Sequence, residues 1–110
     1  MAYDDELAGR IRELISGEIG LGEKKMFGGL AFLVGGNMAI SASGQGGILV
    51  HVDPDHGEAL IAAGPAEPME RRGRPMQGWL RVGAEHLGTR EELARWVELG
   101  AARARGLPAK

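Results

Sequence analysis

Cysteine is absent from this sequence of 110 residues, and its absence excludes several kinds of chemistry at once. No disulfide, thiolate nucleophile or cysteine–zinc site can form, and a chain without cysteine suits a reducing compartment. Long apolar runs are also missing, since no stretch approaches the roughly 18–20 residues needed to cross a bilayer. Residues 1–6 (MAYDDE) are acidic where a signal peptide needs positive charge. We therefore predict a cytoplasmic protein without a membrane segment.

The chain has no large excess of charge of one sign. Its formal net charge is −2, which argues against a broad surface for binding polyanions. The tightest basic cluster consists of Arg71, Arg72 and Arg74. These three arginines could contact a phosphate group or an acidic partner. Alternatively, they form a solvated sheet edge that charge protects from aggregation.

Glycine, by contrast, is abundant, with 19 residues in the chain. None of its clusters fits a phosphate-binding pattern. The P-loop sequence does not occur, and residues 44–47 (GQGG) lack the third glycine of the dinucleotide fingerprint and precede an apolar, strand-like run. The Gly-x-Ser-x-Gly elbow of hydrolases is missing too. We interpret these glycines as the turn residues of hairpins.

The nearest approach to a metal site is the run from His51 to His56, which holds four potential ligands within six residues. A structural interpretation accounts for the same run, because Asp53 can cap a helix that begins with Pro54. His86 has no evident partner nearby in the sequence. No nucleophile is accompanied by a positioned base. We therefore predict a protein that is not an enzyme, with no catalytic residue, metal or cofactor.

Between Lys24 and Asp53 the hydrophobic pattern is that of β-strands. Short apolar runs alternate with glycine-rich turns, as in hairpins whose two-residue turns need positive φ. In the last run Ile48, Val50 and Val52 face one side of the strand and the intervening residues face the other. The pattern predicts an antiparallel meander of about three strands with one face on the core.

Three segments with helical periodicity surround this meander and a second hairpin, which runs from Met69 to Val82. The first is capped by Asp4 or Asp5, the second begins at Asp53, and the third opens with a capping box at Thr89. The order α-β-β-β-α-β-β-α predicts one α+β domain over residues 1–110. In it, helices pack on an antiparallel sheet.

The predicted connection of the second hairpin, Gly73 to Gly78, is longer and more rigid than the others. Its chemistry suits a contact surface. It offers a planar guanidinium, a proline, an adaptable methionine and a large amphipathic ring. The alternative is that Trp79 closes one end of the core. Our candidate partner-contact residues are Arg71, Arg72, Arg74, Pro75, Met76 and Trp79.

Residues 26–32 (MFGGLAF), 36–38 (GNM) and 73–79 (GRPMQGW), in this order and spacing, resemble the N-terminal domain of the TfoX/Sxy family. The resemblance extends from the first predicted helix to Leu107-Pro108. It implies an α+β fold of the type shared with secretion chaperones. The best-known members are bacterial regulators of natural competence that help the cAMP receptor protein act at particular promoters. Those members carry a second, C-terminal domain, so we expect this chain to be a stand-alone copy.

Two classes of function follow. The first is a protein-interaction module, regulatory by resemblance, whose partner is an unidentified protein. The second is a binding domain for a small anion or nucleic acid, centred on the cluster from Arg71 to Arg74. We also expect a homodimer, because soluble oligomers are most often two-fold dimers and hairpin edges leave backbone groups unpaired.

Overall fold

The computed structural model describes residues 4–108 apart from 27, 45, 65 and 72, and it confirms the predicted α+β class. Within these residues, six strands form one antiparallel sheet that three α-helices accompany. In chain order the elements are α1 (Asp5–Ile15), β1 (Leu21–Met26), β2 (Gly29–Val34), β3 (Asn37–Ala42), β4 (Ile48–His51), α2 (Pro54–Ala62), β5 (Ala66–Arg71), β6 (Arg74–Val82), a 3-10 helix η1 (Ala84–His86) and α3 (Arg90–Gly106).

The sheet has the spatial order β1-β2-β3-β4-β6-β5, so β1 and β5 are its two edges. The first meander contains four strands where the sequence predicted about three. The additional strand is β1, which pairs along its whole length with β2, from Leu21 opposite Val34 to Met26 opposite Gly29. Charged residues fill the middle of β1, so pairing with β2 makes this segment a strand although its composition is not typical of one.

The second hairpin also differs from the prediction. Residues 74–78, expected to form a long connection, belong to β6. The chain instead reverses between Arg71 and Arg74, which lie opposite each other in the β5–β6 register. Gly73 has a φ of +78° in this turn, a conformation that favours glycine over any other residue.

Further along, β6 separates from β5 for a short distance. The register shifts after Pro68, and residues 77–79 have no counterpart on β5. Within this bulge Gly78 has a φ of +83°, and its carbonyl accepts a 2.7 Å hydrogen bond from the N–H of Val52. A Cβ at Gly78 would lie 2.8 Å from the Val52 carbonyl oxygen. The bulge therefore fixes Trp79 beside β4, and glycine is required for that approach.

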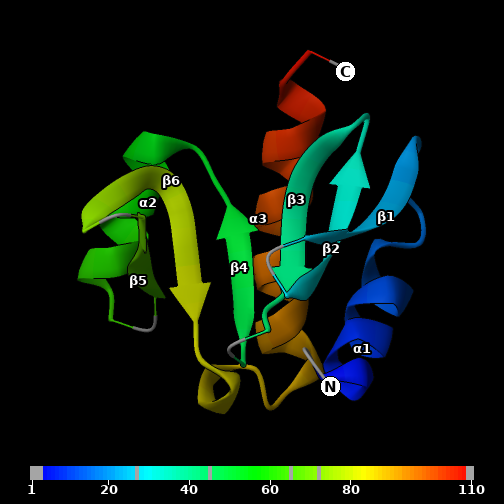
Figure 1. Ribbon diagram of the computed structural model, residues 1–110, viewed down its shortest axis with the longest axis horizontal. Helices are drawn as coiled ribbons and strands as arrows, with labels where there is room; N and C mark the ends of the chain where they lie inside the picture. The colour runs from blue at the N-terminus through cyan, green and yellow to red at the C-terminus, as the bar shows by residue number, and fades with distance from the viewer. Residues whose placement is uncertain (1–3, 27, 45, 65, 72, 109–110) are drawn as a thin grey trace.

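The helices cover one face of the sheet. Figure 1 shows α3 passing behind β3 and β4, with α2 against β6 and α1 beside α3. The alternation predicted for the run that includes β4 agrees with the core cluster, which contains Ile48, Val50 and Val52 but not Leu49, although Leu49 is only 5% exposed. The close approach of α3 depends on Gly100, where a Cβ would overlap the Ala39 carbonyl oxygen and lie 3.1 Å from a methyl group of Val50.

Each α-helix begins at a residue that the sequence indicated. The Asp4 carboxylate accepts hydrogen bonds of 2.9 and 3.1 Å from backbone N–H groups in the first turn of α1. Asp53 does the same for α2, which starts at Pro54. Thr89 and Glu92 form the predicted capping box of α3. These caps satisfy N–H groups that have no partner within the helix.

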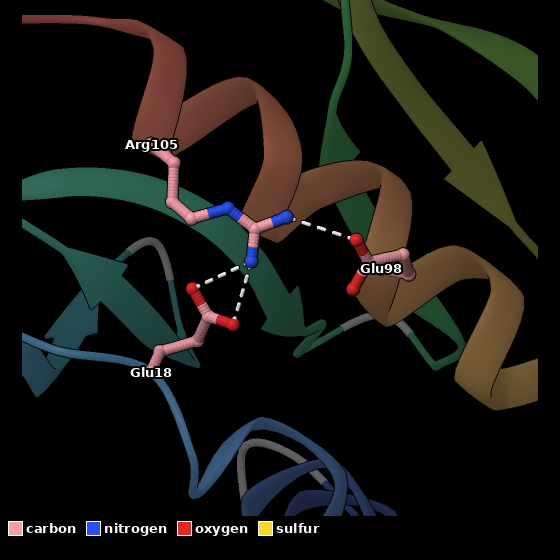
Figure 2. A network of polar contacts seen from close by, with 3 residues as sticks. All are labelled: Glu18, Glu98 and Arg105. Carbon is pink, nitrogen blue, oxygen red and sulfur yellow. Dashed lines mark hydrogen bonds and ion pairs between the residues drawn. The ribbon is translucent and has the colours of Figure 1, made fainter.

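An ion-pair network joins the turn after α1 to the last helix. One terminal nitrogen of Arg105 donates to both carboxylate oxygens of Glu18, at 2.7 and 2.9 Å, and the other donates to Glu98 at 2.9 Å (Figure 2). Hydrogen bonds to Glu98 and Glu18 raise the pKa of Arg105. Because Arg105 and Glu98 are exposed, the network positions the turn more than it stabilises the fold.

A second ion pair joins α1 to the edge strand β1. Arg12 donates two hydrogen bonds to the Glu23 carboxylate, at 2.8 and 2.9 Å. Its guanidinium carbon lies 5.9 Å from the centre of the Phe32 ring. The hydrogen bond from Arg12 holds the pKa of Glu23 below its ordinary value. Glu23 is thereby held in its charged form on the outermost strand.

Candidate functional site

The predicted contact residues lie on the β5–β6 hairpin, at one end of the sheet. Arg71 ends β5, and Arg74 begins β6 directly opposite it. Pro75 and Met76 follow on β6 as strand residues, not as parts of a loop. Arg72 and the side chains of Arg71 and Pro75 lie outside the part of the chain that the structure describes.

A pair of methionines lies next to these arginines. Met69 and Met76 are opposite each other across the hairpin, and both are half-buried. Pro68 pairs with Leu80, a core residue that faces the helices. The register shifts between Pro68 and Met69, so the hairpin end is offset from the part of β6 that packs on the core. Met69, its cross-strand partner Met76, and Arg74 two residues before Met76 share one face of this hairpin end.

Trp79 lies nearer the middle of the sheet, on the face opposite the core residue Leu80. It lies opposite His51 of β4, and the two rings stack with centroids 4.1 Å apart and planes 6° from parallel. Both residues are half-buried. Trp79 lies outside the core cluster of the described residues, whereas Trp96 belongs to it. This observation argues against the alternative that Trp79 closes one end of the core.

The structure thus places five residues on the β5–β6 hairpin and on β4, the strand that pairs with β6. We call this group the hairpin surface: His51, Met69, Arg74, Met76 and Trp79. It combines a stacked ring pair, two flexible thioethers and one exposed guanidinium, a composition suited to contact rather than to acid–base chemistry.

Sequence reasoning missed His51 and Met69 as members of this surface. His51 stood out only as a possible metal ligand, and Met69 only as the start of a hairpin. His51 meets Trp79 because β4 pairs with β6. Nothing local in either segment specifies that pairing of distant strands. Met69 could have been found by extending the period-two alternation backward from the turn.

The potential ligands between His51 and His56 are dispersed in the structure. His51 stacks on Trp79, Asp53 caps α2, and His56 is exposed in the first helical turn. Over the described ranges of the chain, no group of three or more His, Cys, Asp or Glu side chains is placed to hold a metal ion. The prediction that the protein binds no metal still awaits measurement.

No helix in the described part of the chain is both long enough and apolar enough to cross a membrane. A comparison with protein families matches the TfoX N-terminal domain over residues 13–104. The matched range begins within α1 and ends within α3, so it includes every strand of the described sheet. Searches of curated proteins and of solved structures found no match. Because the family match covers residues 13–104 of 110, the chain belongs to the TfoX N-terminal domain family.

Proposed function

We propose that this chain is a non-enzymatic protein-interaction module with a regulatory role, and that the hairpin surface is where its partner binds. The observation that carries the proposal is the half-exposed stack of Trp79 on His51. A tryptophan held against another ring offers a large contact area and loses little conformational freedom on binding. Membership of the TfoX N-terminal domain family supports the regulatory part of the proposal.

The composition of the surface indicates what the partner looks like. Tryptophan, methionine and arginine are enriched at protein interfaces, and binding energy concentrates in a few such residues. Met69 and Met76 can adapt to an apolar side chain beside Trp79. Arg74, exposed at the end of the hairpin, offers a fork that pairs with a carboxylate. A fitting partner presents an apolar anchor next to an acidic group.

Affinity capture with matched variants tests this proposal. The baits are the wild type, Trp79→Ala, and Arg95→Ala as a control for an exposed charge on α3, away from the hairpin. A true partner is retained by Arg95→Ala and reduced at least about tenfold by Trp79→Ala, as expected for an interface hot spot. Circular dichroism verifies that each bait is folded. Equal capture by all three baits refutes the assignment.

A second candidate function is binding of a small anion or nucleic acid at the hairpin end. The observation that favours it is the register itself, which places Arg71 directly opposite Arg74. Like charges across a strand pair destabilise it, and a bound phosphate would relieve that repulsion. Binding of this kind weakens steeply as salt is added. A salt-dependent gel shift lost in Arg74→Ala but kept in Trp79→Ala would favour this function over the first.

A further inference from the structure

The two edges of the sheet differ in how they are protected against pairing. On β5, Pro68 cannot donate a backbone hydrogen bond, and the register shift beside it distorts the edge. On β1 there is no proline, and the register with β2 is unbroken from Leu21 to Met26. An added strand would therefore meet a regular ladder of backbone groups at β1 but not at β5.

The outward-facing backbone groups of β1 can be identified. Gly35 N–H donates to the Gly20 carbonyl at 3.1 Å, so the backbone of residue 20 points toward β2. In an antiparallel ladder this direction alternates along the strand. The even-numbered residues of β1 therefore pair with β2. Leu21, Glu23 and Lys25 present their N–H and C=O groups to the open side.

The charged side chains of β1 can pair with those of a second, antiparallel β1 strand. We propose that β1 is the interface of a homodimer, in which the β1 strands of two copies pair antiparallel about a two-fold axis at Lys24. Glu23 of each copy then lies opposite Lys25 of the other, and both residues use their outward backbone groups. The register centred on Glu23 instead places two glutamates opposite each other, which is unfavourable. This interface is separate from the hairpin surface, which lies toward the other edge.

Two further features agree with a second copy at this edge. Ile19, with 94% of its surface exposed, directly precedes β1 and would lie close to the end of the second copy's β1 strand. Arg12 of α1 donates two hydrogen bonds to the Glu23 carboxylate and lowers its pKa, which keeps it ionised. Against these, the two Lys24 side chains meet at the axis and repel each other. A single strand pair also buries less area than a standard interface, so the dimer is weak and reversible.

Because the chain contains no cysteine, one introduced thiol can report the register. Residues at the axis form a non-hydrogen-bonded pair with Cα atoms about 4.5 Å apart, within the range of a disulfide. Lys24→Cys should form a covalent dimer under mild oxidation at least tenfold faster than Glu67→Cys, an exposed position on β5. Equal cross-linking rates of the two variants would overturn the proposal.

Sedimentation over a concentration series gives an independent test. Lys25→Pro removes an outward N–H and leaves the even-numbered pairing with β2, so it should weaken dimerisation at least tenfold. Lys25→Glu, which places a glutamate opposite Glu23, should do the same and serves if the proline variant is unfolded. Lys24→Thr removes the repulsion at the axis and should tighten the dimer. The proposal is refuted if the wild-type protein stays monomeric at high micromolar concentration. It is also refuted if either Lys25 variant dimerises as tightly as the wild type.

Discussion

Replacing glycine by alanine should have opposite effects in two helices of this protein. Gly9 lies within α1, and a Cβ there would meet no atom within 4 Å. Gly100 lies within α3, where a Cβ would overlap the Ala39 carbonyl oxygen and lie 2.9 Å from its carbonyl carbon. The chemical change is the same at both sites. Only the distance to the sheet differs.

The magnitudes follow from two opposing effects. Alanine favours a helix interior over glycine by about 1 kcal/mol, so Gly9→Ala should stabilise the fold by nearly that amount. At Gly100 the same gain is opposed by a contact with backbone, which cannot rotate away as a side chain can. Overpacking of this kind costs about 1–3 kcal/mol or more. Because this cost exceeds the gain in helix propensity, Gly100→Ala should be destabilising.

Thermal and urea unfolding of the two variants beside the wild type measures this difference. About 1 kcal/mol shifts the melting temperature of a domain this small by about 4–8 °C, so the two variants should differ by several degrees or more. Gly106→Ala is a further control, because a Cβ at the end of α3 meets nothing within 4 Å. A Gly100→Ala protein that melts as high as Gly9→Ala would refute the packing of α3 described above.

Three other predictions concern the tryptophans, acid stability and metals. Trp96→Ala should cost about 3–5 kcal/mol of unfolding free energy, as in other cores, whereas Trp79→Ala should cost less than half as much in the same denaturant titration. Because Arg12 lowers the pKa of Glu23 in the folded state, this pair stabilises the fold above the unfolded-state pKa, and its contribution is lost as pH falls through the folded pKa. The stability of Glu23→Gln should therefore converge with that of the wild type in acid, and an unchanged gap from neutral to strongly acid pH would contradict this. Elemental analysis of untagged protein should find no stoichiometric zinc, and one zinc per chain that His51→Ala removes would contradict it.

Where local chemistry decides an element, the sequence was sufficient to predict it. Asp53 followed by Pro54 predicted the start of α2, and the capping box of Thr89 and Glu92 predicted the start of α3. Both signals act within one helical turn, so no knowledge of the rest of the fold is needed. The inward face of β4 was predicted for a similar reason, because the period of two is visible in five residues.

Where distant pairing decides, the sequence was insufficient. The charged strand β1 has no apolar alternation, and it is a strand because β2 lies beside it. Residues 74–78 were expected to form a loop because they contain proline and glycine, yet β5 holds their first part in register and the bulge accommodates Gly78. The hairpin surface depends on the same kind of fact, since His51 meets Trp79 only when β4 pairs with β6.

The position of α3 has a consequence for how the protein is made. The central strands β3 and β4 are covered by α3, which is the last element of the described chain. During synthesis the apolar face of these strands, including Ile40 and Val50, emerges before the helix that will cover it. Exposed apolar surface and unpaired edges make such nascent states prone to aggregate. A message truncated before codon 90 should therefore yield an insoluble or rapidly degraded product, although it encodes every strand of the sheet.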